Sequence, residues 1–385
     1  MRSDRNVALV MSGGGMNAML LELGFLKRLR ESPLWQRVGW IYGTSAGALA
    51  GVMAALDRLD QLEEFLLALE PHETFRPHRL WQTPLTGLHD YALPDTIAER
   101  LEPADRLAEE LATCPVELIV CVTDVSETLE DGAPHAFERT YSSHADPPEV
   151  MSVAVLASAA ISALVLPLRV GDAIGTDGGW IRNFPLGHAY DNPQVERIVG
   201  FRYVSRHPRP SADNLARLRR RLERFRAVPP VRALIGELVE AEQRQARGEP
   251  AHLPEMIVRL MRITIARNTA LEERTAAEKD ASVRELEALR RDAARIARRH
   301  ALPGRRARAV AEIDARFAAA QFPFRHNRVL PTIIVRGDPG DTQLDPSFRS
   351  GLVWPLDTKR ALLDRGYRLT DAELATHGLD EQIAV

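Results

Sequence analysis

The sequence predicts an α/β fold, in which a mixed, largely parallel sheet lies between helices and an α-helical insertion follows. Two strand–glycine–helix units open the chain, one around Gly14 and one around Ser45. Short runs rich in valine, isoleucine and leucine then alternate with helical patterns up to about residue 204, as in sheets buried on both faces. Strand patterns are missing between residues 206 and 322. We therefore assign residues 1–205 to a core, 206–322 to the insertion and 323–385 to a C-terminal return to the core.

The first unit is an apolar strand over residues 6–11, then a glycine loop, then a helix over residues 18–31. Gly13, Gly14 and Gly15 let main-chain N–H groups converge at a helix N-terminus, where they can hold an anion or an oxyanion. The pattern also fits a dinucleotide fingerprint, G-x-G-x-x-A. That reading needs an acidic residue at the end of the second strand, and the sequence has none there. An oxyanion site is the favoured interpretation.

The second unit is a strand over residues 38–42, the motif Gly43-Thr44-Ser45-Ala46-Gly47, and a helix over residues 46–56. A nucleophilic serine must project from a sharp strand-to-helix turn, and side chains two residues to either side would clash there. Gly43 and Gly47 remove those clashes. The motif predicts that Ser45 is a nucleophile. An incidental serine in a glycine-rich turn is the alternative, because this short motif often occurs by chance.

A second candidate catalytic group follows the strand-like run over residues 168–174. Asp177 lies between that run and the pair Gly178-Gly179. An aspartate before glycine is also common in a simple Asx turn. Asp172 is a rival acid, but it lies in a predicted hairpin turn. None of the eleven histidines stands in a motif that indicates chemistry.

Three motifs in this order, each in its structural context, resemble the patatin-like phospholipases, bacterial members included. The stretch from Ala157-Ser158 to Pro167, and Asn183-x-Pro185, fit as well. The resemblance covers about residues 6–204, more faintly 329–370, and leaves the insertion uncovered. It implies a three-layer sandwich that hydrolyses lipid or other acyl esters without cofactor or metal.

The resemblance also implies residue roles. Ser45 would be the nucleophile, Asp177 the general base, and the amides of Gly13, Gly14 and Gly15 the oxyanion hole. Gly43 and Gly47 would shape the nucleophile turn, and Gly178 and Gly179 the aspartate loop. Many bacterial relatives carry Arg and then Gly where this chain has Asn17 and Ala18.

Composition narrows the partners and the compartment. The formal net charge is −3, which gives no global attraction to nucleic acid. Cys114 and Cys121 are the only cysteines and flank one strand, too far apart to bridge. We expect a reducing, cytoplasmic setting, since the sequence shows no secretory segment and no apolar run that spans a bilayer.

The insertion contains an arginine-rich helix over residues 215–226 with a leucine stripe at helical spacing. A solvated helix packed through that stripe is the favoured interpretation, and a peripheral contact with anionic membrane is the alternative. The pattern does not indicate an oligomeric state.

Two other functions compete with the dyad. One is a Ser-His-Asp esterase, whose histidine would follow the acid: His188, His207, His252, His300 and His326 are eligible. The other is a non-catalytic scaffold that works through the insertion. A dyad with an aspartate base of little-shifted pKa predicts an acid limb below the range of a free imidazole.

Overall fold

The computed structural model describes residues 4–78, 89–126, 137–162, 164–204, 213–247, 253–319, 329–345 and 351–379. These residues form two compact units, which we describe separately. The first comprises residues 1–204 and 268–385, and the second comprises residues 205–267. The assignment of residues 206–322 to one insertion therefore stays a prediction.

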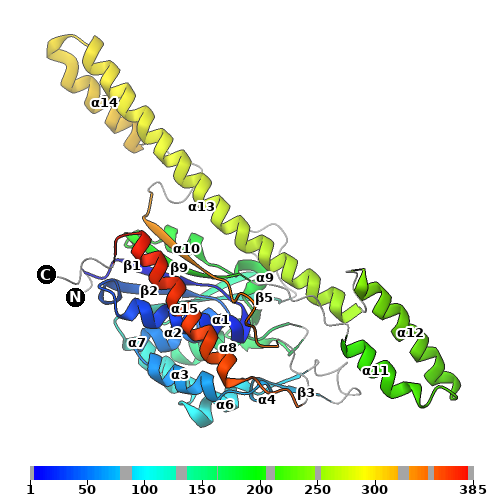
Figure 1. The fold of residues 1–385 in the computed structure, drawn as a ribbon. Coiled ribbons are helices and arrows are strands. Elements are labelled where there is room, and N and C mark those ends of the chain that lie inside the picture. The colour runs from blue at the N-terminus through cyan, green and yellow to red at the C-terminus, as the bar shows by residue number, and fades with distance from the viewer. Residues whose placement is uncertain are drawn as a thin grey trace. The chain divides into compact units, whose positions relative to one another are not determined.

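The first unit contains an eight-stranded mixed sheet among the described residues, in the order β10-β9-β1-β2-β5-β8-β7, with β6 beside β5 (Figure 1). Its parallel part comprises β1 (Val7–Met11), β2 (Val38–Gly43), β5 (Glu117–Asp124), β9 (Arg197–Tyr203) and β10 (Thr332–Gly337). Its antiparallel additions are β6 (Glu138–Ser142), β7 (Leu168–Val170) and β8 (Ala173–Asp177). The predicted largely parallel sheet between helices is confirmed.

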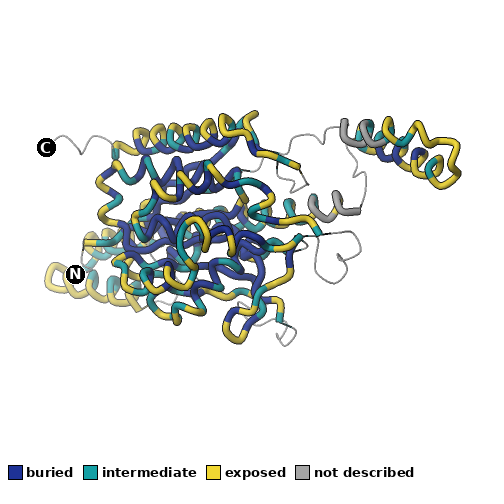
Figure 2. The backbone as a smooth tube through the Cα atoms, turned by 90° about the horizontal axis from the view of Figure 1, so that it is seen from below, coloured by how far each residue is buried: buried dark blue, intermediate teal, exposed yellow. Residues whose placement is uncertain are grey.

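Alternation along the strands builds two apolar layers. Val7, Leu9 and Met11 of β1 belong to the larger core, while Ala8 and Val10 face the smaller one. This is the period of two that a strand buried on both faces requires. Figure 2 shows these buried residues gathered in the middle of the unit.

Helices cover both faces of the sheet. The larger core packs under α1 (Gly15–Arg30), α2 (Ala46–Ala55), α3 (Leu59–Ala68), α7 (Ala104–Thr113), α8 (Pro148–Ser158) and α15 (Leu356–Thr376). The smaller core packs under α10 (Leu186–Asp191) and part of α13 (Leu253–His300). The remaining short elements of this unit are α4 (Pro71–Thr74), β3 (Phe75–Pro77), β4 (His89–Tyr91), α6 (Leu93–Arg100) and α9 (Gly179–Arg182).

Helices α1 and α15 pack backbone to backbone. A Cβ at Gly24 would lie 2.1 Å from the Leu363 carbonyl oxygen, and one at Gly366 would lie 2.0 Å from that of Leu21. The Thr370 hydroxyl bonds the Gly366 carbonyl within one continuous helix, because close packing on α1 carries the helix past the glycine.

The sequence of residues 71–91 has no clear periodicity and so predicts an irregular loop. The described part instead forms α4 and an antiparallel β3–β4 pair, in which Phe75 stacks on Tyr91 with ring centroids 5.6 Å apart. The order comes from aromatic packing across the pair, which has no sequence periodicity. Residues 79–88 lie outside the described residues.

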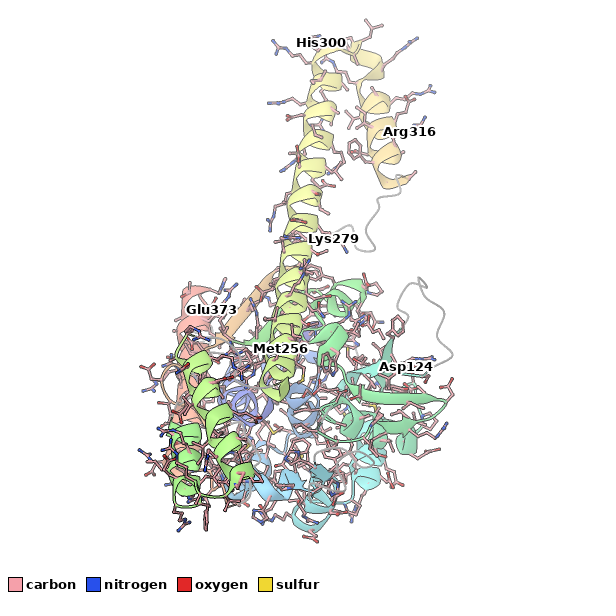
Figure 3. The ribbon with its side chains drawn as sticks, turned by 90° about the vertical axis from the view of Figure 1, so that its right-hand side faces the viewer. Asp124, Met256, Lys279, His300, Arg316 and Glu373 are labelled. Atoms are coloured by element: carbon pink, nitrogen blue, oxygen red, sulfur yellow. The ribbon has the colours of Figure 1, made fainter. Side chains whose placement is uncertain are left out.

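Beyond the sheet, α13 extends over 48 residues, whereas the sequence pattern by itself predicts a helix over residues 271–299. It is followed by α14 (Arg306–Ala319), which returns beside it through an ion pair of 2.7 Å between Arg290 and Asp314. Side chains such as Lys279, His300 and Arg316 project outward from this pair of helices (Figure 3).

The second unit contains α11 (Asp213–Glu223), α12 (Pro229–Ala246) and the first turns of α13. Ile235, Leu238 and Ala241 are its buried apolar residues on α12. Arg219 and Glu242 join α11 to α12 at 2.9 Å. The side chains of Leu215, Arg217 and Leu218 lie outside the described residues, so the predicted leucine stripe is described only at Leu222, which is half-buried.

Candidate active site

Ser45 sits on the sharp turn between β2 and α2 that its sequence predicted. Its backbone has φ 53° and ψ −118°, in the region that residues with a Cβ rarely adopt. A Cβ at Gly43 would lie 2.5 Å from the Gly47 carbonyl oxygen, and one at Gly47 would lie 2.6 Å from that of Met11. Only glycine fits at both places, so the spacing of the motif has a steric cause.

The register of the sheet brings Asp177 to Ser45. Gly43 on β2 pairs with Val120 on β5, and Val122 on β5 pairs with Asp177 on β8. Ser45 follows Gly43 by two residues, and Val122 follows Val120 by two. Ser45 and Asp177 therefore lie at the same level along β5. Strand β8 is antiparallel, so pairing with β5, and not a shared row of parallel strand ends, places the aspartate.

Ser45 and Asp177 are in direct contact. Ser45 Oγ donates to Asp177 Oδ2 at 2.8 Å, and the Gly179 N–H donates to Asp177 Oδ1 at 2.7 Å. The side chains are buried, since the two residues are 5% and 8% exposed. The predicted distance is confirmed. The rival Asp172 lies in the β7–β8 hairpin turn, as expected.

Burial raises the pKa of Asp177 to about 6, against the lowering effect of the hydrogen bonds from Gly179 and Ser45. The expectation of little net shift was wrong. Desolvation dominates because the carboxylate is enclosed, and depth of burial cannot be read from the Asp-Gly-Gly motif. A carboxylate with this pKa is a stronger base than an ordinary aspartate and is still mostly ionised at neutral pH.

The three glycine amides are not equivalent. The Gly13 N–H already donates to the Asn183 carbonyl at 3.1 Å. The amides of Gly14 and Gly15 make no hydrogen bond to other described residues. Gly15 opens α1 with φ 64°, and it lines the same cavity as Ser45. Of the three predicted donors, the amides of Gly14 and Gly15 are therefore the ones without an acceptor among the described residues, and they lie at the positive end of a 16-residue helix.

Sequence reasoning missed the groups that hold the nucleophile in place. Ser158 accepts a hydrogen bond from the Ser45 N–H at 2.9 Å and donates to the Cys121 carbonyl at 2.7 Å. The Thr44 hydroxyl donates to the Arg182 carbonyl at 2.8 Å. Ser158 lies in a stretch that the resemblance had marked, but its partner is 113 residues away in sequence.

Asn17, one departure from the usual family pattern, has a structural partner. Its side chain donates to the Leu344 carbonyl at 3.2 Å and accepts from the Leu344 N–H at 2.8 Å. This pair fixes the start of α1 to the C-terminal segment. Ala18 is buried, and a Cβ added at Gly14 would lie 2.6 Å from the Cβ of Ala18.

An apolar cavity leads away from Ser45. Its empty volume is ≈ 1040 Å³, the space open to solvent at its mouth included. Its walls come mainly from α1, α2, α3, α6, α7 and α8 and include Met19, Leu49, Phe65, Leu107 and Val155. Trp354, which precedes α15, also lines the cavity. A cavity of this size and character suits a long hydrocarbon chain and offers little to a polar one.

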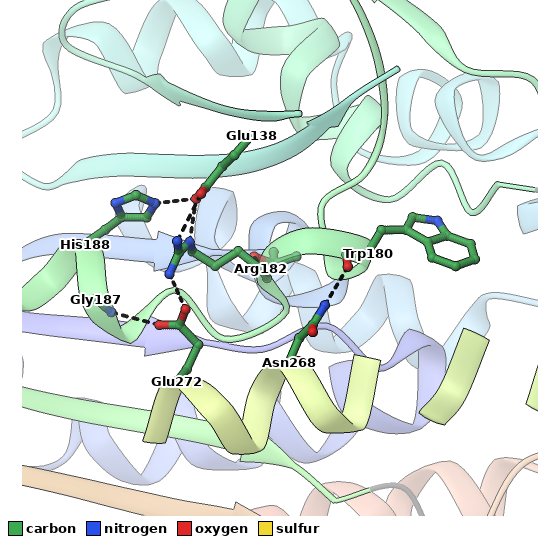
Figure 4. Close-up of polar contacts among 8 residues, drawn as sticks. Glu138, Trp180, Arg182, Gly187, His188, Asn268 and Glu272 are labelled. Carbon is green, nitrogen blue, oxygen red and sulfur yellow. Dashed lines mark hydrogen bonds and ion pairs between the residues drawn. The ribbon is translucent and has the colours of Figure 1, made fainter. Parts of the chain in front are cut away.

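One group of side chains has the composition of a metal site. Cys121, Glu138 and His188 offer ligand atoms within 4.8 Å of one another. The Arg182 guanidinium also pairs with Glu138 and, although burial opposes it, Glu138 and Cys121 raise the pKa of His188 to about 10. A protonated imidazole is not a ligand, so the chemistry of the group favours an ion-pair network. Its partners are drawn in Figure 4.

This network also occupies one of the histidines that a triad would need. His188 Nε2 lies 2.6 Å from Glu138, and the described residues around the cavity include no histidine. His300 is exposed at the end of α13. His207, His252 and His326 lie outside the described residues. Cys114 and Cys121 are both free thiols, as predicted.

The family model of the patatin-like phospholipases matches residues 9–190, which contain the glycine loop, Ser45 and Asp177. Over these residues the chain is similar to the patatin-like phospholipases. This family comprises lipid acyl hydrolases. Most residues that line the apolar cavity beside Ser45 lie within the matched residues 9–190. The predicted insertion, which includes α13, follows the matched residues.

The crystal structure of VipD from Legionella pneumophila is similar to this chain with a TM-score of 0.39 and 13% identity, over 97% of this chain and 67% of that one. No curated protein matches the sequence. None of the helices in the described part of the chain is long and apolar enough to cross a membrane.

Proposed function

We propose that this patatin-like protein hydrolyses carboxylic esters of lipids through a dyad of Ser45 and Asp177. One observation carries the proposal: the 2.8 Å contact between these side chains lies at the wall of an apolar cavity. The contact supplies an activated nucleophile, and the cavity supplies room for the acyl chain. The reaction needs no metal or other cofactor in this scheme.

The first half of the reaction forms an acyl-enzyme. Ser45 Oγ attacks the ester carbonyl carbon while Asp177 Oδ2 takes its proton. The carbonyl oxygen becomes an oxyanion, which the Gly14 and Gly15 amides stabilise at the N-terminus of α1. Such donors are typically worth about 3 kcal/mol each in the transition state. The bond to the leaving alcohol then breaks, and Asp177 returns the proton to that alcohol.

The second half releases the acid. Asp177, again ionised, takes a proton from a water that attacks the acyl-enzyme carbonyl. The ester bond to Ser45 breaks, and the proton passes back to Ser45 Oγ. The raised pKa of Asp177 suits both halves, because the same carboxyl must accept and return a proton near neutral pH.

A fluorophosphonate probe tests the nucleophile directly. Intact-protein mass spectrometry of the wild type should show one adduct, and the Ser45→Ala variant should show none. Ser282→Ala, an exposed serine on α13, is the matched control and should label like the wild type. An adduct of equal yield on Ser45→Ala would reject Ser45. Lipid extracts treated with wild type and Ser45→Ala then show which esters disappear.

For the second unit we propose a peripheral contact with anionic membrane, with the protein in the cytoplasm. The turn between α11 and α12 exposes apolar side chains, with Phe225 50% and Val228 47% exposed. Arg224 lies over the Phe225 ring at 5.3 Å. Further exposed arginines flank this turn, at positions 220, 221, 226 and 232. Apolar tips within a basic surface are typical of segments that enter the headgroup region.

Vesicle sedimentation tests this contact. Changing Arg220, Arg221 and Arg224 to Glu should weaken binding to phosphatidylcholine vesicles that contain phosphatidylglycerol by about 100-fold or more, at ~1 kcal/mol per lost charge. The same changes at Arg295, Arg298 and Arg299 on α13 should have little effect. Binding of the wild type should fall steeply with salt. Equal losses in both triple variants, or none in either, would leave only the solvated, packed helix.

A further inference from the structure

One turn of α13 contacts the loop that carries the general base. Residues 268–272 lie after the sequence matched by the family model and within the first compact unit. Figure 4 shows Asn268 and Glu272 pointing from this helix toward α9 and the start of α10. Asn268 and Thr269 both lie beside Glu272 on the helix surface, because they precede it by four and three residues.

The contacts hold consecutive parts of the loop after Asp177. Asn268 Nδ2 donates to the Trp180 carbonyl at 2.7 Å. Glu272 pairs with the Arg182 guanidinium and accepts the Gly187 N–H at 3.3 Å. Side-chain contacts to main-chain groups at both ends of a short segment fix its path, and not only one rotamer.

The same loop reaches the other two parts of the site. The Arg182 carbonyl accepts the Thr44 hydroxyl beside the nucleophile, and the Asn183 carbonyl accepts the Gly13 N–H. The Asn183 amide in turn donates to Thr269 on α13 at 3.2 Å. The serine turn, the glycine loop and the aspartate loop are therefore joined through residues 182–183, and these residues are held by α13.

Electrostatics makes the Arg182 contact firm. The guanidinium lies between two carboxylates, Glu138 on β6 and Glu272 on α13, and its side chain is only 18% exposed. Burial opposes the charged form, but these carboxylates outweigh it and hold the pKa of Arg182 above its already high ordinary value. Removing Glu272 would leave Arg182 paired with Glu138 alone. The loop would then be held toward the sheet but no longer toward the helix.

We infer that Asn268 and Glu272 of α13 are positioning residues for the proposed dyad. They set the path of residues 178–187, and through it the alignment of Asp177 and the glycine loop with Ser45. Neither side chain touches the substrate. The inference rests on the proposed function, because positioning has an effect only if Ser45 and Asp177 react.

The test compares Glu272→Ala, Glu272→Gln and Asn268→Ala with a matched control, Glu278→Ala. Glu278 lies on the same helix, is 69% exposed and pairs with its neighbour Arg274. Misplacement of about 1 Å can cost about 100-fold in rate. We expect kcat to fall 10-fold to 100-fold in Glu272→Ala and Asn268→Ala, with KM within about 2-fold of the wild type. The rate of fluorophosphonate labelling should fall by the same factor as kcat.

Glu272→Gln keeps an oxygen acceptor for Gly187 and Arg182, so it should retain more activity than Glu272→Ala. The control should behave like the wild type. Wild-type kcat in both Glu272→Ala and Asn268→Ala, with a folded protein by circular dichroism, would overturn the inference and leave the dyad intact. A wild type that neither labels nor hydrolyses esters would overturn the proposed function instead. A loss shared by Glu278→Ala would mean general destabilisation and would also overturn the inference.

Discussion

Replacing Ser45 with Ala or Asp177 with Asn should each lower kcat for ester hydrolysis by at least about 10³-fold, with normal folding. The two groups share one proton, so the serine without its base and the base without its serine are both ineffective. Groups that act as a unit are strongly non-additive. The Ser45→Ala/Asp177→Asn double variant should therefore be little worse than either single variant. Steady-state hydrolysis of a chromogenic acyl ester measures all three.

The chain offers a matched control for each change. Asp172→Asn alters an exposed aspartate in the neighbouring hairpin turn, and Ser282→Ala alters an exposed serine. Both should keep wild-type kcat. Asp177→Asn is close in shape to the native residue and keeps an oxygen for the Gly179 N–H, so loss of folding is not expected. Undiminished activity in Asp177→Asn would require a different base and would favour the Ser-His-Asp alternative.

The predictable part of this site is the part set by local sterics. Gly43 and Gly47 predict the turn at Ser45, because a Cβ at either position would meet main-chain atoms. For Gly43 these atoms belong to Gly47, and for Gly47 they belong to Met11 on the adjacent strand. The continuous apolar run from Val7 to Met11 predicts a strand buried on both faces. Such constraints act within a turn or between adjacent strands, so local residue patterns carry them.

The unpredictable part depends on contacts between distant segments. Ser158 holds the Ser45 amide across 113 residues, and Asn268 holds Trp180 across 88. Both donors and acceptors are common residues without a distinctive local pattern. The charged pattern predicts a helix only over residues 271–299, and nothing in it distinguishes the turn that contacts the aspartate loop from the turns that face solvent.

The pKa of Asp177 determines the second large effect, which is the pH dependence of catalysis. An Asp base works only when ionised, and burial raises the pKa of Asp177 to about 6. Below that pH the ionised fraction falls tenfold for each unit. We expect kcat/KM, which reports the free enzyme, to be about 100-fold lower at pH 4 than on its plateau. Above pH 7 this group should cause no further rise.

An acid limb near pH 6 also overlaps the range of a free imidazole, near ~6.5, so its position alone does not separate a dyad from a triad. Replacement of histidines does. His188→Gln removes an imidazole whose pKa is raised to about 10, which would stay protonated across this range. The limb should therefore survive that change, and also Gln at His207, His252, His300 and His326 in turn. It should be lost only with Asp177. One result would replace the Ser45–Asp177 dyad with a Ser-His-Asp triad: the acid limb disappears with one particular histidine, and plateau activity falls as in Ser45→Ala. The titrating base would then be the imidazole, and the buried carboxylate would be its partner.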